Sequence, residues 1–295
     1  MTDLMTRRTL VARSVAATAA LALPPAAMAE TADPLVAKLR EVEARLGARI
    51  GASVFEVGSG RRWSHRAEER FPIASTFKAF ACAALLARID RGEKRLADEV
   101  AIRSSDLVTY SPVVEKHVGG AMALGDLCAA ATALSDNAAG NLILDNIGGP
   151  AGLTAFMRGI GDEATRLDRR ETELNEAAPG DPRDTTTPAA AAESLRKLLL
   201  GDVLSPKSRR QLQDWLVANQ VGGPLLRASL PQGWRIADRT GAGGRGTRNV
   251  LAAIWPPGRE PVFAAIYLTG TEASMDARNA AIAEIGRTLV GILRA

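Results

Sequence analysis

Apolar residues recur at helical spacing near both ends of the chain. One apolar stripe predicts an amphipathic helix over residues 34–47, and a second predicts a closing helix over residues 273–294. The stripe residues are Leu35, Leu39, Val42 and Leu46 in the first helix and Ile282, Ile285, Leu289 and Ile292 in the last. Each helix must therefore bury one face against another layer of the fold.

Strand patterns lie just inside these two helices, and helical patterns fill the middle of the chain. A hairpin is predicted from residues 50–57 and 61–65. After the glycines at 222–223, the predicted strands are residues 234–240, 250–255 and 262–268. The predicted middle helices are a segment from near Ser75 to about Ile89 and residues 124–134, 139–147, 153–160, 189–200 and 206–217.

This order of elements favours an α/β (α+β) fold in which both ends of the chain share one antiparallel sheet. Residues 30–68 and 218–295 would form a discontinuous α/β domain with flanking helices, and residues 69–217 an inserted helical domain. A cleft between two such domains is a natural site for a small molecule.

The composition is that of an ordinary globular protein. Hydrophobic residues make up 46% of the 295 residues and charged residues 24%, which is enough apolar material for a large core. Aromatic residues make up only 4%, too few for base-stacking platforms, and the net charge of +4 is not gathered in a basic stripe. We therefore expect no nucleic-acid partner.

Residues 1–29 have the pattern of an export signal. A basic start is followed by an apolar run at 15–23 and an A-x-A cleavage site that ends at Ala29. The adjacent Arg7 and Arg8 leave the general secretory and twin-arginine routes both open. No other apolar run reaches the ~20 residues that a membrane helix needs. We expect a soluble periplasmic or secreted protein with no membrane partner.

The chain has two cysteines and two histidines. In an oxidising compartment Cys82 and Cys128 are expected to form a disulfide rather than a metal site, and two buried free thiols are the alternative. His65 and His117 have no companions at metal-binding spacing. We expect no metal.

Ser75 and Lys78 form a Ser-x-x-Lys pair at the start of an apolar helix. Residues three apart lie on the same helix face, so the Lys78 amine can reach the Ser75 hydroxyl. Burial can lower the pKa of a lysine until it accepts a proton and activates a serine. The pair is a candidate nucleophile and base, although the motif alone is common by chance.

Two further runs carry candidate chemistry. Ser135-Asp136-Asn137 lies between two helical patterns, where its hydroxyl and carboxamide could face a cleft or the run could simply connect the helices. Residues 238–244 pass from a strand into small residues. Exposed N–H groups there could bind an oxyanion. Arg239 and Thr240 could bind a substrate carboxylate. A plain glycine-rich strand end is the alternative.

Taken in order, these motifs resemble those of the class A serine β-lactamases, which carry Ser-x-x-Lys, Ser-Asp-Asn and a Lys-Thr-Gly-like strand. Glu171 and Asn175 fit the family's Glu-x-x-Leu-Asn element. Arg169 and Asp184 flank this element as the ion pair that closes the family's Ω-loop. The resemblance covers essentially the whole chain after the export signal.

The resemblance implies a fold like that of the serine β-lactamases and penicillin-binding proteins, with a five-stranded antiparallel sheet. It also implies a monomer without metal or organic cofactor. Cys82 and Cys128 match a disulfide found in many members. Tyr110 matches the aromatic residue at the cleft entrance.

The implied activity is hydrolysis of the β-lactam amide through an acyl-enzyme, which confers β-lactam resistance. Ser75 would attack the carbonyl, while the N–H groups of Ser75 and Ala242 would bind the oxyanion. The serine proton would leave through Lys78, or through Glu171 by way of a water. Ser135 would pass a proton to the lactam nitrogen. In the second half of the reaction Glu171 would activate a water and Asn175 would position it. The implied substrate-binding residues are Tyr110, Asn137, Arg239, Thr240, Gly241 and Arg248.

The departures from the family pattern bear on the substrates. Arg239 replaces the usual lysine, as in the carbenicillin-hydrolysing subgroup, and a guanidinium binds a carboxylate bidentately. We therefore expect hydrolysis of penicillins, including carbenicillin-type compounds, and of some cephalosporins. Ala74 and Gly243 stand where some carbapenem-hydrolysing members have an extra disulfide, which argues against that activity. The pair Ser135 and Arg248 suggests inactivation by clavulanate-type inhibitors.

Two alternatives share the same fold. A penicillin-binding D,D-peptidase would carry the first three motifs but no carboxylate on an Ω-loop, so Glu171 separates the two classes. A non-catalytic β-lactam-binding protein would bind penicillin without turnover.

Overall fold

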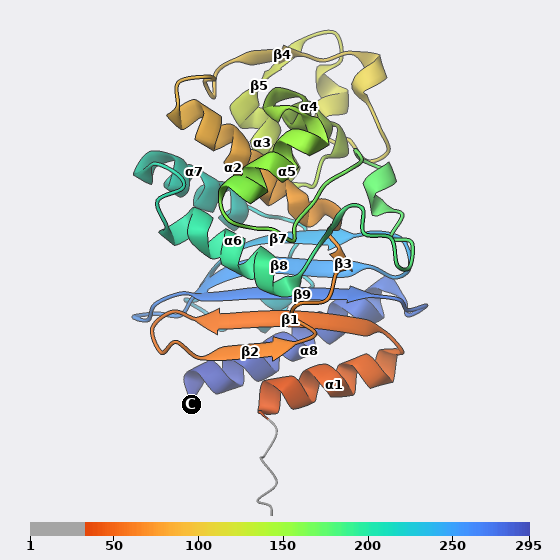
Figure 1. The fold of residues 1–295 in the computed structure, drawn as a ribbon, viewed down its shortest axis with the longest axis vertical. Coiled ribbons are helices and arrows are strands. Elements are labelled where there is room, and N and C mark those ends of the chain that lie inside the picture. Colours follow the sequence, from red (N-terminus) through yellow and green to blue (C-terminus); the bar gives the residue numbers. More distant parts are fainter. Residues whose placement is uncertain (1–32) are drawn as a thin grey trace, which may run out of the picture. The chain divides into compact units, whose positions relative to one another are not determined.

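A five-stranded antiparallel sheet forms the centre of the fold, with its strands in the order β2-β1-β9-β8-β7 (Figure 1). The structure is a computed structural model that describes residues 33–295. The strands are β1 (Arg49–Glu56), β2 (Arg62–His65), β7 (Arg235–Ala242), β8 (Arg248–Trp255) and β9 (Val262–Thr269). The two ends of the chain thus share one sheet, as the sequence predicts.

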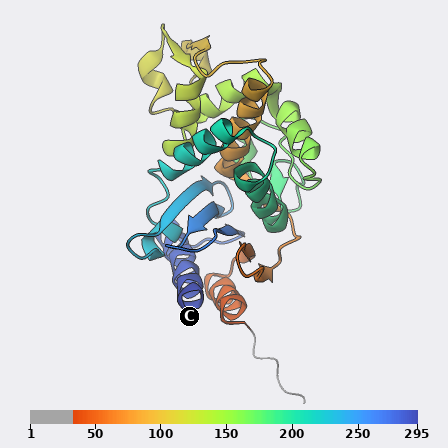
Figure 2. The same cartoon turned by 90° about the vertical axis from the view of Figure 1, so that its left-hand side faces the viewer.

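Helices α1 (Pro34–Leu46) and α8 (Met275–Arg294) lie side by side on one face of this sheet (Figures 1 and 2). The predicted apolar stripes face inward and form one hydrophobic cluster with the strands. At the helix contact, Lys38 Nζ lies 3.0 Å from Glu284 Oε1. Asp33 accepts from the Leu35 N–H at 2.9 Å and so begins α1 at its expected residue.

The other face of the sheet is covered by α6 (Pro188–Leu200), beyond which the remaining helices pack (Figure 2). Helix α2 (Phe77–Asp90) is at the centre of this helical part and contacts all four of its other helices. These are α3 (Leu124–Ala133), α4 (Asn137–Ile147), α5 (Gly149–Gly159) and α7 (Pro206–Val217). Because α2 is apolar on every side, it is buried along most of its length.

Short elements connect the two parts. Two-stranded sheets are formed by β3 (Phe71–Pro72) with β6 (Thr185–Thr186) and by β4 (Glu99–Ala101) with β5 (Ala121–Ala123). The 3-10 helices are Ala74–Thr76, Ser104–Asp106, Val114–His117, Glu173–Asn175 and Leu226–Ser229. The β3–β6 pair is the functionally important one, because it joins the approach to Ser75 to the segment that follows Glu171.

The expected fold class is confirmed, and the predicted helices and strands agree with the structure to within a few residues at their ends. Residues 33–295 form one compact unit, and the expected division at residues 69 and 217 stays a prediction. The export signal at 1–29 lies outside the described residues. None of the helices in the described range is both long and apolar enough to cross a membrane.

Candidate active site

Ser75 lies in the 3-10 turn Ala74–Thr76, immediately before α2. Its side chain is nearly buried, and the preceding Ala74 has a φ of +44°, in the left-handed region that residues with a Cβ rarely occupy. The Thr76 hydroxyl donates to the Ile73 carbonyl at 2.6 Å, which closes the turn. The local backbone therefore aims the serine hydroxyl away from the helix axis and toward the other polar side chains.

The Lys78 amine lies directly beneath the serine. Lys78 is fully buried, and its Nζ donates to Ser75 Oγ at 3.0 Å. The other acceptors around Nζ are the Ser135 carbonyl at 2.9 Å, Asn137 Oδ1 at 2.6 Å and Glu171 Oε1 at 2.9 Å. Burial lowers the pKa of Lys78 to about 8, against the opposing effect of the Glu171 carboxylate.

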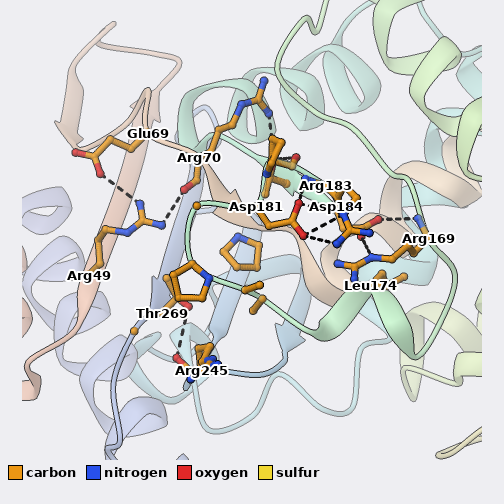
Figure 3. A pocket seen from close by; sticks show the side chains of 18 residues that line it. Arg49, Glu69, Arg70, Arg169, Leu174, Asp181, Arg183, Asp184, Arg245 and Thr269 are labelled. Carbon is orange, nitrogen blue, oxygen red and sulfur yellow. Dashed lines mark hydrogen bonds and ion pairs between the residues drawn. The ribbon is translucent and has the colours of Figure 1, made fainter.

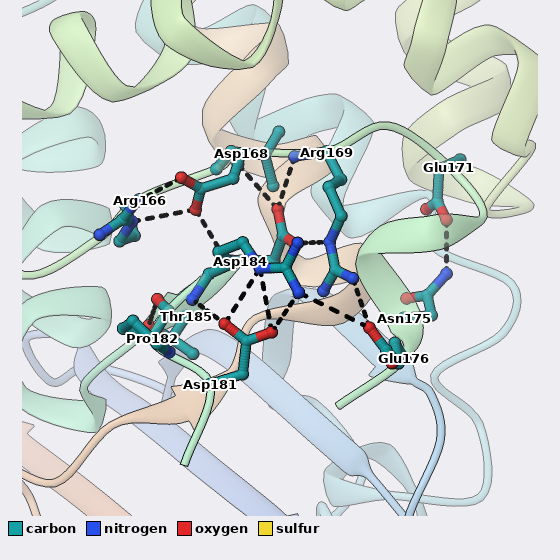
Figure 4. Close-up of polar contacts among 12 residues, drawn as sticks. Arg166, Asp168, Arg169, Glu171, Asn175, Glu176, Asp181, Pro182, Asp184 and Thr185 are labelled. Carbon is teal, nitrogen blue, oxygen red and sulfur yellow. Dashed lines mark hydrogen bonds and ion pairs between the residues drawn. The ribbon is translucent and has the colours of Figure 1, made fainter. Parts of the chain in front are cut away.

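Glu171 approaches Ser75 from the other side. Ser75 Oγ donates to Glu171 Oε1 at 3.0 Å. Asn175 Nδ2 donates to Glu171 Oε2 at 2.5 Å (Figure 4). The Asn141 side chain bonds both the N–H and the carbonyl of Glu171, each at 2.9 Å, so its backbone is fixed to α4. The peptide bond between Glu171 and Thr172 is cis.

The segment from Arg169 to Asp184, here called the Ω segment, is closed at its base by charged groups (Figure 4). Arg169 Nε lies 2.6 Å from Asp184 Oδ2, which confirms the expected ion pair. Asp184 Oδ1 also accepts from the N–H groups of Asp168 and Arg169 at 2.7 and 2.9 Å. The carboxylate of Asp184 is nearly inaccessible to solvent, so these contacts compensate the cost of its burial.

The Ser135-Asp136-Asn137 run is both a helix connector and part of the site. Asp136 caps α4 by accepting from the Ala139 N–H at 2.9 Å, and its second oxygen accepts from the N–H groups of Val113 and Val114. Ser135 has a φ of +64°, and its hydroxyl oxygen lies 3.4 Å from the Lys78 amine. Asn137 Nδ2 donates to the Thr109 carbonyl at 2.8 Å, which leaves Oδ1 for Lys78.

Strand β7 is an edge strand, and its C-terminal half passes Ser75. A Cβ on Gly241 would lie 3.1 Å from Ala74 Cβ and 3.3 Å from the Ser75 nitrogen, so glycine permits this close approach. Thr240 and Gly241 are buried, and Ala242 is partly exposed. The strand therefore presents backbone next to the nucleophile, as the sequence suggests.

Arg239 reaches the site from behind. Its guanidinium is fully buried and hydrogen-bonds the Ser135 hydroxyl through Nη2, whereas Nε and Nη1 have no partner within residues 33–295. Burial lowers the pKa of Arg239 to about 10, partly offset by Asp238. The sequence suggested direct bidentate contact with a carboxylate, but in the structure Ser135 stands between Arg239 and the cavity.

Arg248 is the second cation of the site and does border the cavity. Its Nε donates to Asn279 Oδ1 at 2.7 Å, and Nη1 lies 3.4 Å from the Gly241 carbonyl. Burial lowers the pKa of Arg248 to about 10, and the nearby Arg278 cation adds to the effect. Asn279 thus orients the arginine from α8.

These elements surround a cavity of about 430 Å³. Its lining residues are Ser75, Tyr110, Ser135, Asn137, Asn175, Val221, Thr240, Gly241, Ala242, Arg248 and Met275. Lys78, Glu171 and Arg239 lie behind this surface and act on it through Ser75, Asn175 and Ser135. Sequence reasoning missed Val221 and Met275, whose only local signals are a glycine-rich linker and the start of a helix.

A somewhat larger cavity of about 490 Å³ is bordered by residues of the Ω segment (Figure 3). Arg49, Arg169 and Arg183 border it, and each is paired with a carboxylate. Neither Ser75 nor any of the Ser135, Asn137 and Arg248 side chains borders it, so we assign the chemistry to the smaller cavity. Across residues 33–295, no three His, Cys, Asp or Glu side chains are grouped so as to hold a metal ion.

Cys82 and Cys128 are free thiols in the structure, which is the alternative to the expected disulfide. Both are free and fully buried, on the facing helices α2 and α3, and Cys82 Sγ lies 3.9 Å from the Cys128 carbonyl oxygen. Burial raises the pKa of the Cys128 thiol well above its usual value. A protonated, buried thiol is unreactive toward exchange. The two residues are neighbours, as the resemblance implies, and the bond between them stays a prediction.

Comparisons with known proteins agree with this site. A model of the Beta-lactamase enzyme family matches residues 34–293. Beta-lactamase AER-1 of Aeromonas hydrophila is 51% identical over 268 residues, which are 90% of this chain and 88% of that protein. The structure of an ancestral (GNCA) class A β-lactamase is 58% identical with a TM-score of 0.86, and the match covers 88% of this chain and 99% of that one. The structure of the last common ancestor of Gram-negative bacteria (GNCA4) class A β-lactamase is 56% identical with a TM-score of 0.87. The match covers 88% of this chain and 100% of that one.

The chain therefore belongs to the β-lactamase enzyme family. Its identity to class A enzymes over nearly the whole described length places it in that class, and the class hydrolyses β-lactams.

Proposed function

We propose that the protein hydrolyses penicillins, including carbenicillin-type compounds, and some cephalosporins through an acyl-enzyme on Ser75. One observation carries the proposal. The Ser75 hydroxyl oxygen lies 3.0 Å from both the Lys78 amine and a Glu171 carboxylate oxygen, and it faces a cavity of about 430 Å³. A serine with a cation and a carboxylate at hydrogen-bond distance is an activated nucleophile.

Glu171 is the acylation base that the resting geometry favours. Four oxygens lie within 3.0 Å of Lys78 Nζ, and three of them, the Ser135 carbonyl, Asn137 Oδ1 and Glu171 Oε1, can only accept. An ammonium with three N–H donors suits these neighbours better than a neutral amine with a lone pair. A pKa of about 8 also keeps Lys78 mostly charged at neutral pH. Glu171 then takes the serine proton, while the Lys78 cation stabilises the negative charge that develops on Ser75 Oγ.

The attack forms a bond from Ser75 Oγ to the lactam carbonyl carbon and places negative charge on the carbonyl oxygen. The N–H groups of Ser75 and Ala242 bind that oxygen as the C–N bond breaks. Ser135 gives its proton to the departing nitrogen and receives another from Lys78, whose amine is 3.4 Å away. Lys78 then takes the proton that Glu171 accepted from Ser75, across the 2.9 Å between Nζ and Glu171 Oε1, which restores the ammonium and the carboxylate. The result is an ester on Ser75 and an opened ring.

Deacylation uses the Glu171 and Asn175 pair. Asn175 Oδ1 is buried without a hydrogen-bond partner within residues 33–295, although its Nδ2 binds Glu171. A water that donates to this free oxygen would lie beside the Glu171 carboxylate, which removes its proton as it attacks the ester carbon. The bond from that carbon to Ser75 Oγ then breaks, and Ser75 Oγ takes its proton back from Glu171, whose Oε1 is 3.0 Å away. The unsatisfied acceptor thus supports the role of Asn175 in holding the water.

Charge and shape support the substrate class. Arg239 and Arg248 place two cations near Thr240, where the carboxylate of a penicillin binds, and Arg239 acts through Ser135 rather than by direct contact. Asn137 and Tyr110 border the opposite side of the cavity and contact the acylamide side chain. The same groups admit clavulanate, which inactivates the enzyme in a time-dependent manner.

Glu171→Ala tests the proposal. With nitrocefin or ampicillin, we expect acylation to continue slowly and the acyl-enzyme to accumulate, because no carboxylate remains to activate water. Mass spectrometry would detect a stable adduct on Ser75. Turnover would fall by about 10³-fold or more, because Glu171 is the general base in both acylation and deacylation.

The matched control is Glu173→Ala, because Glu173 is an exposed carboxylate two residues away on the same loop. It should turn over like the wild type. Equal turnover in both variants without an adduct would contradict the role of Glu171. Slow deacylation in the wild type itself would favour a D,D-peptidase-like protein, and stoichiometric binding without an adduct would favour a non-catalytic one.

A further inference from the structure

One residue from each of four neighbouring strands points toward the Ser75 turn. Gly51 of β1, Tyr267 of β9, Asn249 of β8 and Gly241 of β7 are consecutive partners across the sheet. The two glycines leave space, because a Cβ on Gly51 would lie 2.3 Å from the Phe71 ring and one on Gly241 would crowd Ala74. The two side chains between them can therefore reach the turn itself.

Asn249 bonds the backbone just before the nucleophile. It is fully buried, and its Nδ2 donates to the Pro72 carbonyl at 2.8 Å and to the Ile73 carbonyl at 3.3 Å. Its Oδ1 has no partner within residues 33–295, so the side chain contributes hydrogen bonds only through its amino group. A buried amide with an unsatisfied oxygen costs stability, which implies that the two donated bonds matter.

Tyr267 supports the same turn from the next strand. The Tyr267 hydroxyl lies 3.1 Å from Thr76 Oγ1. The Thr76 hydroxyl in turn donates to the Ile73 carbonyl at 2.6 Å. The Ile73 carbonyl thus receives donors from both sides. It immediately precedes Ala74, whose φ of +44° persists only if its surroundings fix it.

We propose that Asn249 is a positioning residue for the oxyanion-binding N–H of Ser75. By holding the Pro72 and Ile73 carbonyls against β8, it keeps Ala74 left-handed and thereby aims the Ser75 N–H at the carbonyl oxygen of the substrate. The two carbonyls that Asn249 binds lie only three and two residues before the N–H that it positions. This inference rests on the proposed acyl-enzyme.

Asn249→Leu in a Glu171→Gln background tests it. Leucine is close in size and removes only the donated hydrogen bonds, and Glu171→Gln holds the acyl-enzyme for study. We expect the ester C=O stretch of the ampicillin acyl-enzyme to move to higher wavenumber in infrared difference spectra, because a misaligned N–H polarises the carbonyl less. The acylation rate constant should fall about 10-fold, below the loss for removing an oxyanion donor outright, with little change in KM.

Asn146→Leu is the matched control. Asn146 donates to the Leu142 carbonyl at 2.9 Å and accepts from Lys94 Nζ at 3.1 Å, so its replacement also removes two side-chain hydrogen bonds, none of them to the Ser75 turn. It should lower Tm without moving the ester band. Should Asn249→Leu fail to fold, Tyr267→Phe removes one hydroxyl from the same turn and should shift the band in the same direction by a smaller amount.

An unchanged ester band and acylation rate in folded Asn249→Leu, or in Tyr267→Phe where only that variant folds, would overturn the inference and leave the proposed function intact. Absence of any ester band in the Glu171→Gln parent would instead overturn the acyl-enzyme, and this inference with it.

Discussion

The Ser75 turn and the Ω segment both contribute to the site, but they are held in different ways. The turn is fastened to the sheet by neutral, buried groups, chiefly Asn249 and the Thr76–Tyr267 pair. The Ω segment is fastened by charged groups, chiefly Arg169 and Asp184. Loss of one neutral hydrogen bond leaves no charge behind, whereas loss of one member of a buried ion pair leaves the other charge uncompensated. Disturbance of the turn should therefore appear in acylation, and disturbance of the Ω segment in deacylation.

Among the variants that test this difference, loss of the Asp184 carboxylate should have the largest effect on stability and on deacylation. Asp184→Ala leaves Arg169 and two backbone N–H groups without their buried acceptor, which should destabilise the protein by about 3 kcal/mol. Glu171 would also be less well placed, so we expect deacylation to slow by about 10-fold and acylation to change little. Urea unfolding and pre-steady-state kinetics with nitrocefin would measure the two effects.

Glu176→Gln serves as the control for that variant. Glu176 also pairs with Arg169, at 2.5 Å, but its carboxylate is 56% exposed. An exposed pair contributes less than about 1 kcal/mol, so both stability and deacylation should stay near the wild-type values. If the two variants behave alike, the Ω segment is not held by its buried pair, and the comparison with the Ser75 turn fails.

The pH profile of acylation should sharpen the assignment of the base. The pKa of Lys78 is lowered to about 8, so the cation that assists Ser75 is lost as the pH rises through that value. We expect kcat/KM for a slowly acylating penicillin to decline with an apparent pKa near 8, a value that belongs to the coupled Lys78–Glu171 pair.

A neutral Lys78 that acts as the base would give the opposite slope, with kcat/KM increasing up to about pH 8. Lys78→Arg is the control variant, since its cation persists through this range and the declining limb should disappear from its residual activity.

Arg239→Lys should have the smallest effect, because it keeps the charge. Lysine lacks the spare Nε and Nη1 donors that Arg239 holds behind Ser135. We expect kcat/KM for carbenicillin to fall about fivefold relative to ampicillin, which corresponds to a loss of about 1 kcal/mol. Comparable ratios of the two efficiencies in wild type and variant would show that arginine does not set this preference.

Much of the fold could be predicted, because its helices and strands have strong local patterns. The stripes of α1 and α8 face the sheet as expected, and β8 and β9 are buried apolar runs between proline-rich and glycine-rich turns. The short β3–β6 pair could not be predicted. Two residues a strand carry no periodicity, and their pairing depends on the closed Ω segment.

The site was predictable as a set of residues but not as a set of distances. Ser75, Lys78, Ser135 and Glu171 do converge, because each motif carries its own residue types at fixed spacing. The position of Arg239 behind Ser135 depends on how β7 packs against the Ser75 turn and α7, which no local pattern encodes. Asn249 gave no signal either, since a polar residue in an apolar strand is informative only once its buried partners are known.

Within residues 33–295, strand β7 has no neighbouring strand on its outer side, and such an edge normally attracts another strand. Many proteins protect an edge by covering it, but here the end of β7 borders the cavity beside Ser75. Helix α7 contacts the strand and limits the exposed length. If α7 were to detach during heating or storage, the freed edge would offer a template for pairing between copies. The route by which this enzyme is lost in solution is therefore expected to be association through β7, before its sheet unfolds.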